Sequence, residues 1–313
     1  MTHHHTIILG AGAAGLMAAA HAGHGTLLLD DDKAPGDKIR IWGGGRCNFT
    51  NLYCEPSNFL SHNPHFCKSA LSRYTPYDFI ALVDKHGIAY HEKTAGQLFC
   101  DNSSKDIVSL LQRECDEAGV EILTECEIQS VAHSNEFAVD CAHGTFAAPS
   151  LVVASGGLSI PKMGATGFGY DIARQFGLKV FDTSAGLVPF TFTGAMHELT
   201  GRLSGVSTRA TVTANGTSFT EDILFTHRGL SGPAVLQVSS FWRPGDEIEI
   251  DLLPGIAATD VLLEAKKEQS RTLLRTTLAS LLPRALVNEL EGAWWAERAD
   301  VPLAEIANDV LHK

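Results

Sequence analysis

A glycine-rich turn near the N-terminus constrains the fold of this chain more than any other feature. The apolar run 6–9 ends in Gly10, and the segment 10–15 reads Gly-Ala-Gly-Ala-Ala-Gly before an alanine-rich stretch typical of a helix. Gly10 permits a tight turn, Gly12 lets a pyrophosphate approach the backbone, and Gly15 lets the helix pack on the strand. The anion would lie at the helix N-terminus. The order strand, turn and helix therefore predicts a dinucleotide-binding unit; a glycine-rich turn that binds nothing is the alternative.

An acidic residue follows at the spacing that a nucleotide ribose requires. The apolar segment 26–29 predicts a second strand, and Asp30 lies twenty residues after Gly10. Three successive aspartates begin there, and they would repel a 2′-phosphate, which disfavours NADP and leaves FAD or NAD. We expect Asp30 to bind the ribose, with Asp31 beside it in the site. A solvated turn is the alternative for Asp31 and Asp32.

A second glycine-rich segment favours FAD over NAD. Three glycines are followed by Arg-Cys-Asn, and the segment comprises Gly43, Gly44, Gly45, Arg46, Cys47 and Asn48. The backbone N–H groups of such a loop can face an anion or a planar ring, while the arginine supplies a fixed charge. We expect these residues and Lys38 to contact the cofactor. For the cysteine, a buried and inert thiol is the alternative.

These motifs resemble those of the BaiN/YhiN-like flavoproteins, NAD(P)/FAD-dependent oxidoreductases related to aminoacetone oxidase and dehydro-bile-acid reductase. The matching segments are GAGAAGLMAA at 10–19, GGGRCNFTN at 43–51, the strand-to-glycine segment 151–170, and FTHRGLSGP at 225–233. The resemblance implies FAD contacts from the first turn and from the strand-to-glycine segment, by Gly10, Gly12, Ala13, Ala14, Gly15, Ser155, Gly156 and Gly157. It also places Ile128 against the adenine, where an ordinary core position is the alternative. The chain departs from the family pattern at Trp42, Ser155, Ala165 and Phe168.

The order of predicted elements indicates an α/β fold. We expect a Rossmann-like FAD-binding domain of the two-dinucleotide-binding flavoprotein type over 1–186, with helices at 77–85 and 104–118 and a hairpin within 136–148. An inserted β-rich domain follows over 187–255, where Asn215-Gly216 is typical of a two-residue hairpin turn.

Amphipathic helical segments at 261–268 and 272–295 predict a small helical subdomain over 256–313. By resemblance, family members continue with a C-terminal segment that returns to the FAD domain. We expect that segment to be absent here, which would leave a truncated chain with weak FAD binding and poor turnover.

The charge balance argues against nucleic acid as a partner. The chain has 36 acidic and 24 basic residues, a net charge of −12, and no run of more than two lysines or arginines. The apolar stretch 7–20 is too short to span a bilayer, so we expect no membrane partner. Seven cysteines without a C-x-x-C pair indicate a reducing cytoplasm. We expect no metal site, His62 and His65 being a weak exception in spacing.

These features predict an FAD-dependent oxidoreductase acting on a small organic substrate, with the flavin as hydride acceptor or donor and NAD(P)H as an optional partner. His227 is the predicted catalytic proton donor, because it lies in a glycine-bounded loop and histidine is the usual side chain for proton transfer near neutral pH; a structural histidine in a turn is the alternative. Two other functions stay open. One is a non-catalytic or impaired dinucleotide-binding fragment, and the other is a flavin-dependent RNA-modifying protein, which the charge disfavours.

Overall fold

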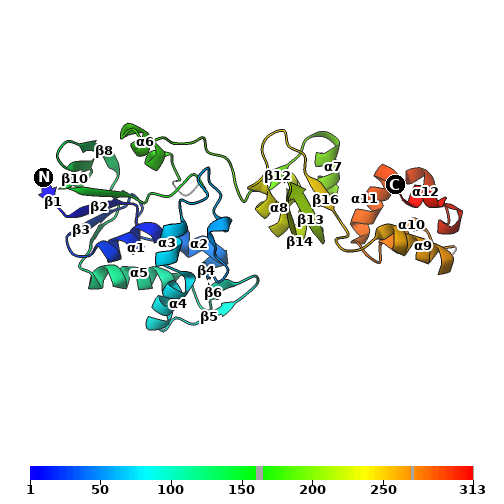
Figure 1. The fold of residues 1–313 in the computed structure, drawn as a ribbon, viewed down its shortest axis with the longest axis horizontal. Helices are drawn as coiled ribbons and strands as arrows, with labels where there is room; N and C mark the ends of the chain where they lie inside the picture. The colour runs from blue at the N-terminus through cyan, green and yellow to red at the C-terminus, as the bar shows by residue number, and fades with distance from the viewer. Residues whose placement is uncertain (160–164, 269–270, 313) are drawn as a thin grey trace. The chain divides into compact units, whose positions relative to one another are not determined.

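The computed structural model describes residues 1–159, 165–268 and 271–312. The chain forms two compact units, Met1–Phe181 and Asp182–Lys313 (Figure 1). The domain boundaries predicted after residues 186 and 255 stay predictions. In the predicted strand-to-glycine segment, residues 160–164 lie outside the described part of the chain.

A four-stranded parallel sheet forms the centre of the first unit. In spatial order its strands are β11 (Ser150–Val153), β2 (Thr6–Leu9), β3 (Thr26–Leu29) and β7 (Glu121–Leu123). Every neighbouring pair is parallel. The two inner strands are apolar and buried, as a parallel sheet covered on both faces requires. The predicted α/β, Rossmann-like fold is confirmed.

Different layers cover the two faces of this sheet. On one face, Ile8 and Leu28 join a buried cluster with residues of α1 (Ala13–Ala22) and α5 (Lys105–Glu117). On the other face, Ile7 and its alternating neighbours pack against a second sheet. Successive strand residues point to opposite faces, so one short apolar strand supplies side chains to both layers.

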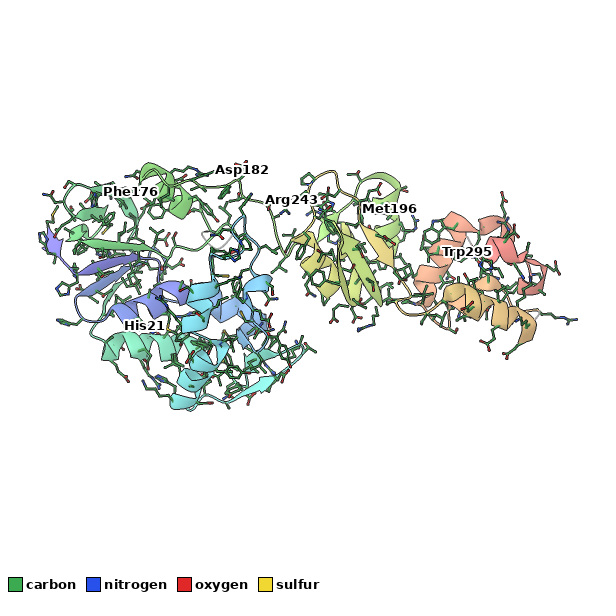
Figure 2. All side chains as sticks on the ribbon, viewed as in Figure 1. His21, Phe176, Asp182, Met196, Arg243 and Trp295 are labelled. Carbon is green, nitrogen blue, oxygen red and sulfur yellow. The ribbon has the colours of Figure 1, made fainter. Side chains whose placement is uncertain are left out.

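The second sheet of this unit is made of β1 (Thr2–His3), β10 (Gly144–Ala148), β9 (Phe137–Cys141) and β8 (Ile128–His133). The hairpin expected within 136–148 is present, since β9 and β10 pair antiparallel. Helix α6 (Phe168–Gln175) lies beside it: Gln175 donates to the carbonyl of Val131 at 2.6 Å, and Phe176 meets Phe137 edge-on at 5.6 Å between ring centroids (Figure 2).

A small antiparallel sheet completes the first unit. It consists of β4 (Asn48–Asn51), β6 (Gln97–Cys100) and β5 (Tyr90–Glu92). Short helices α2 (Asp37–Ile41), α3 (Lys68–Arg73) and α4 (Pro76–Lys85) and two 3-10 turns, Trp42–Gly45 and Pro56–Asn58, belong to the same part of the chain. Strand β4 begins at Asn48, the last residue of the loop predicted over 43–48.

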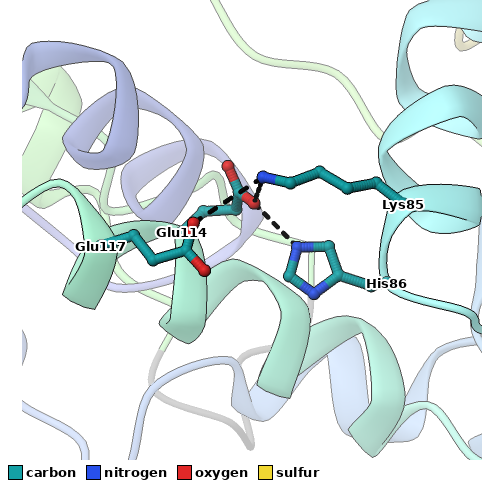
Figure 3. A network of polar contacts seen from close by, with 4 residues as sticks. All are labelled: Lys85, His86, Glu114 and Glu117. Carbon is teal, nitrogen blue, oxygen red and sulfur yellow. Dashed lines mark hydrogen bonds and ion pairs between the residues drawn. The ribbon is translucent and has the colours of Figure 1, made fainter.

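Helix α4 begins at a capping box and is joined to α5 by a polar cluster. Thr75 and Asp78 exchange side-chain to backbone hydrogen bonds at the start of the helix. At its end, Glu114 of α5 accepts from Lys85 Nζ and is paired with His86 Nε2, each at 2.7 Å (Figure 3). The predicted helices 77–85 and 104–118 are therefore present, each within about one residue of its expected limits.

The second unit contains a five-stranded antiparallel sheet. Its spatial order is β12 (Phe190–Thr191), β15 (Gly229–Ser231), β14 (Thr217–Thr226), β13 (Ser207–Ala214) and β16 (Glu249–Asp251). Asn215 and Gly216 join β13 to β14 with φ of 48° and 75°, the left-handed pair that the Asn-Gly dipeptide predicts. Helices α7 (Gly194–Arg202) and α8 (Pro233–Ser239) pack with these strands.

Helical segments follow the sheet in the second unit. They are α9 (Ala258–Glu268), α10 (Leu274–Leu278), α11 (Arg284–Trp294) and α12 (Asn308–Leu311), with 3-10 turns at Ala296–Arg298 and Leu303–Glu305. The helical segment expected at 272–295 is divided, because Pro283 has ψ of 130° and lacks an N–H group. Within the described residues, no helix is long and apolar enough to cross a membrane.

Candidate functional site

A cavity of about 730 Å³ opens in the first unit where three parallel strands end. Its lining includes Gly10, Asp30 and Ala154, which immediately follow β2, β3 and β11. Strand β2 lies between β3 and β11. The chain forms β3 on one side of β2 first and adds β11 on the other side much later in the sequence. Such a switch point is where open α/β sheets bind ligands. The volume lies in the range of small-molecule and cofactor sites.

The glycines of the first turn have separate structural roles. A Cβ on Gly10 would lie 2.6 Å from the carbonyl oxygen of Ala154, and a Cβ on Gly15 would overlap the carbonyl oxygen of Gly10. These two positions allow the backbone to pack closely. A Cβ on Gly12 would meet nothing within 4 Å, so this position faces open space on the cavity lining. The free volume lies at the N-terminus of α1, where unpaired backbone N–H groups favour an anion.

Asp30 connects the end of β3 to the glycine turn. Its carboxylate accepts hydrogen bonds from the backbone N–H of Ala11 and from that of Asp32, the latter at 2.9 Å. Burial raises the pKa of Asp30 above its ordinary value, and the two backbone donors oppose that rise only in part. The carboxylate lines the cavity with both oxygens held in place, and each oxygen keeps a lone pair for a ligand hydroxyl.

The cavity brings together most of the residues that the sequence analysis selected. The lining contains Gly10, Gly12, Ala13, Ala14, Asp30, Asp31, Lys38, Cys47, Asn48, Ile128, Ser155 and Gly156. Among the described lining residues, Lys38 is the one basic side chain, and its Nζ lies 3.2 Å from where a Cβ on Gly156 would be. The site thus joins segments from the first turn, α2, β4, β8 and the end of β11.

Other selected residues lie outside the lining. Gly157, Arg46 and the three glycines of the second glycine-rich segment are not among the described lining residues, and Gly15 serves the packing of α1. Gly43 and Gly44 have φ of 63° and 68°, which explains glycine at those positions without a ligand. Their predicted contacts with a cofactor stay predictions.

The sequence analysis missed several apolar and acidic lining residues. Met17, Phe49, Phe79, Ile107 and Leu111 belong to helices and strands whose periodicity indicates only a core position. Glu127 and Phe168 also line the cavity. Glu127 directly precedes Ile128, which was predicted to contact the adenine, so its place at the start of β8 was the signal that could have identified it as a lining residue.

Cys47 is a protonated, buried thiol on this lining. Burial raises its pKa to about 11, so the thiolate is scarce near neutral pH. Its backbone has a φ of 50°, a left-handed conformation that is unusual for a residue with a side chain. Cys47 therefore contributes shape and apolar surface, in line with the inert thiol that the sequence analysis kept as an alternative.

His227 belongs to the second unit. It lies in the turn between β14 and β15, is exposed, and follows Thr226, whose hydroxyl accepts from the backbone N–H groups of Arg228 and Gly229. A Cβ on Gly229 would clash with the backbone of Phe190, so the turn is closely packed. The catalytic role of His227 stays a prediction.

Comparison with known proteins identifies relatives over nearly the whole chain. A family model described as HI0933-like protein Rossmann domain matches residues 4–221, and one described as HI0933-like protein barrel and H2TH domain matches 184–313. A ribosomal RNA dihydrouridine synthase of Escherichia coli K12 is 52% identical over 290 residues, covering 91% of this chain and 72% of the relative. The Haemophilus influenzae protein of the same name is 47% identical over 311 residues, covering 96% and 76%.

Among solved structures, the open conformation of a flavocytochrome c3 fumarate reductase is 17% identical to this chain. The match covers 66% of this chain and 47% of the reductase, with a TM-score of 0.43.

These relatives overturn two predictions. Both curated relatives act on ribosomal RNA by name, which contradicts a small-molecule oxidoreductase and contradicts the exclusion of nucleic acid. The error arose because a net charge of −12 is a sum over the whole surface and does not report local contacts. The expectation of a flavin-dependent redox enzyme is confirmed, as is kinship with a flavoprotein family. That kinship holds at the HI0933-like level, and the curated relatives do not carry the BaiN/YhiN name.

Proposed function

The chain belongs to the HI0933-like family, and from that membership we propose that it is an FAD-dependent dihydrouridine synthase acting on ribosomal RNA. The observation that carries this proposal is the 52% identity, over 91% of this chain, to a relative named for that reaction. The function corresponds to the RNA-modifying alternative left open by the sequence.

The residues of the cavity fit an FAD molecule. Gly12 leaves space for the pyrophosphate at the N-terminus of α1, and Asp30 offers its carboxylate to the adenosine ribose. By resemblance, Ile128 would border the adenine of FAD, and Ser155 and Gly156, which also line the cavity, would border its flavin. Lys38 adds a positive charge to a lining that also holds Asp31, Asp32, Asp37 and Glu127.

Reduction of uridine to dihydrouridine adds a hydride and a proton across the C5–C6 double bond. A bound, reduced flavin supplies the hydride, and the protein holds the base, excludes water and delivers the proton. Cys47 lines the cavity as a protonated thiol near neutral pH, because burial raises its pKa to about 11. His227 remains our candidate donor, since a histidine exchanges protons near neutrality.

The test uses purified protein and ribosomal RNA from cells that lack the corresponding gene. Cofactor released by heat should be FAD by chromatography, and FMN or NAD alone would contradict the assignment. After anaerobic reduction by dithionite, the protein should convert a uridine to a residue heavier by about 2 Da, read by mass spectrometry of RNA digests. RNA that stays unmodified by flavin-loaded protein would refute the proposed reaction.

A matched pair of variants controls this test. Gly12→Val should bind no FAD, because its side chain would fill the space at the N-terminus of α1. Gly292→Val changes an exposed helical glycine with equally open surroundings in the second unit, and it should keep FAD and activity.

A further inference from the structure

Residues 52–67, here called the aromatic loop, expose several large rings. Tyr53 is 68% exposed, Phe66 56% and Phe59 39%. Soluble proteins rarely concentrate exposed apolar side chains in this way unless the surface binds something. The loop joins β4 to α3, and the residues Cys47, Asn48 and Phe49 at the start of β4 line the cavity.

Chain geometry keeps the aromatic loop close to the site. Tyr53 follows Phe49 by four residues, so their Cα atoms can be no more than about 14 Å apart. The Tyr53 ring lies against the turn before β6: a Cβ on Gly96 would come within 2.7 Å of a ring carbon. At least one exposed ring is thus fixed within a few nucleotide lengths of the cavity.

The loop is ordered by its own polar groups. The Asn51 side chain accepts from the N–H of Tyr53, the Asn58 side chain accepts from the N–H of Glu55, and the Asn63 side chain accepts from the N–H of His65. The His62 ring stacks on Phe181 at 4.1 Å with 10° between the planes. Rings held by such a framework lose little conformational freedom when they bind a flat partner.

The local charge favours RNA as that partner. Residues 52–75 contain one acidic residue, Glu55, and two basic residues, Lys68 and Arg73, within a chain whose net charge is −12. With only two basic residues, this segment can neutralise few phosphates, so RNA binding there needs contacts that do not depend on charge. Stacking of unpaired bases on aromatic rings is such a contact, and it tolerates any base.

We infer that the aromatic loop stacks unpaired bases of the RNA beside the target uridine, with Tyr53 and Phe66 as the principal rings. The inference rests on the proposed function and assigns the substrate a single-stranded form at the site. Binding should depend weakly on salt, with a slope of log K against log salt no steeper than about −2, because two cations flank the rings.

The experiment measures fluorescence anisotropy of a labelled twelve-residue oligouridine with FAD-loaded protein. The double variant Tyr53→Ala, Phe66→Ala should bind at least about tenfold more weakly than wild type, whereas Tyr53→Trp, Phe66→Trp should bind within about twofold of it. Tyr77→Ala removes an equally exposed ring from α4 and should leave the affinity unchanged. Flavin absorbance and thermal unfolding check that each variant is folded and loaded.

Three results would overturn the inference: no binding of oligouridine by wild type, equal binding of a duplex of the same length, or an alanine variant within about twofold of wild type. None of these measurements requires turnover. If binding depends on the rings but no dihydrouridine forms, the proposed reaction is refuted and the role of the aromatic loop stands. If the alanine variant binds as tightly as wild type and forms dihydrouridine, the role of the aromatic loop is refuted and the proposed reaction stands.

Discussion

At the scale of single residues, glycines that look alike in sequence differ in what a side chain at each position would contact. Gly10 and Gly15 allow backbone to approach backbone, and Gly12 borders free volume. Their neighbour in space, Asp30, holds the turn through the N–H of Ala11. The same few residues thus shape the turn and present its ligand-binding groups.

Asp30→Ala should weaken FAD binding by about 1–3 kcal/mol, the range of a charge-assisted hydrogen bond. The substitution removes the acceptor for the ribose and frees the N–H groups of Ala11 and Asp32. The dissociation constant can be measured by flavin fluorescence during titration of apoprotein. Asp116→Ala, an exposed position on α5, is the control, and an affinity for Asp30→Ala equal to that control would exclude the ribose contact.

Cys47 should react slowly with iodoacetamide in the folded protein. With a pKa of about 11, roughly one molecule in a thousand carries the thiolate at pH 8. Between its ordinary pKa of 9.0 and about 11, the unfolded chain releases this proton and the folded chain keeps it, so this group's contribution to stability falls as pH rises through that window. Peptide mass spectrometry should find Cys47 alkylated at least about tenfold more slowly than the less buried Cys54. Equal rates would show that Cys47 is accessible and ionised.

At the scale of elements, two helices far apart in sequence are held together by one carboxylate. Glu114 on α5 faces Lys85 and His86 at the end of α4, and the His86 side chain is 7% exposed (Figure 3). The hydrogen bonds from Lys85 and His86 lower the pKa of Glu114. Helix α4 therefore docks through a polar contact as well as through buried Val83.

Glu114→Gln should lower the free energy of unfolding by about 1 kcal/mol, because it weakens the acceptor of a nearly buried histidine. Since the folded pKa of Glu114 lies below its ordinary 4.5, its contribution is complete above pH 4.5 and is lost as pH falls through the folded value. Urea unfolding at pH 7 and pH 4 measures both effects. Glu117→Gln alters a more exposed carboxylate 3.7 Å from Lys85 and should change stability by less than about 0.5 kcal/mol. If Glu114→Gln lowers the free energy of unfolding by no more than Glu117→Gln does, the contact of Glu114 with Lys85 and His86 adds no stability.

At the scale of the whole molecule, the chain has separate cores on either side of residue 181. The clusters around Ile8 and Ile7 belong to the first unit, and the cluster around Ile223 and Leu286 belongs to the second. Residues 182–187 between them are exposed. All the described residues that line the cavity lie at or before Phe168.

Limited proteolysis should first cut between residues 182 and 187, since exposed connections without buried contacts are preferred sites. The N-terminal fragment should keep its flavin absorbance through gel filtration, because every described lining residue belongs to the first unit. Mass spectrometry locates the cut, and the ratio of flavin to protein measures retention. Loss of flavin at the same rate as the cut would show that the second unit is needed to hold it.

The first half of the site was predictable because its signals are local. Glycine spacing, the short apolar strands and Asp30 lie within about thirty residues, where chain geometry fixes their relation. The Asn-Gly hairpin was predictable for the same reason. The exclusion of RNA was wrong because the net charge is a sum over all residues and does not say where the charges lie.

The sequence alone determined the Rossmann-type order of strand, glycine turn, helix and acidic residue, since each is set by backbone sterics and side-chain chemistry over a few positions. Only the tertiary structure decided that Phe79, Ile107 and Leu111 border the same cavity as Gly12, and that the rings of the aromatic loop stay exposed. Periodicity marks a residue as apolar and buried, but whether it faces a neighbour or a cavity depends on elements that meet only when the chain packs.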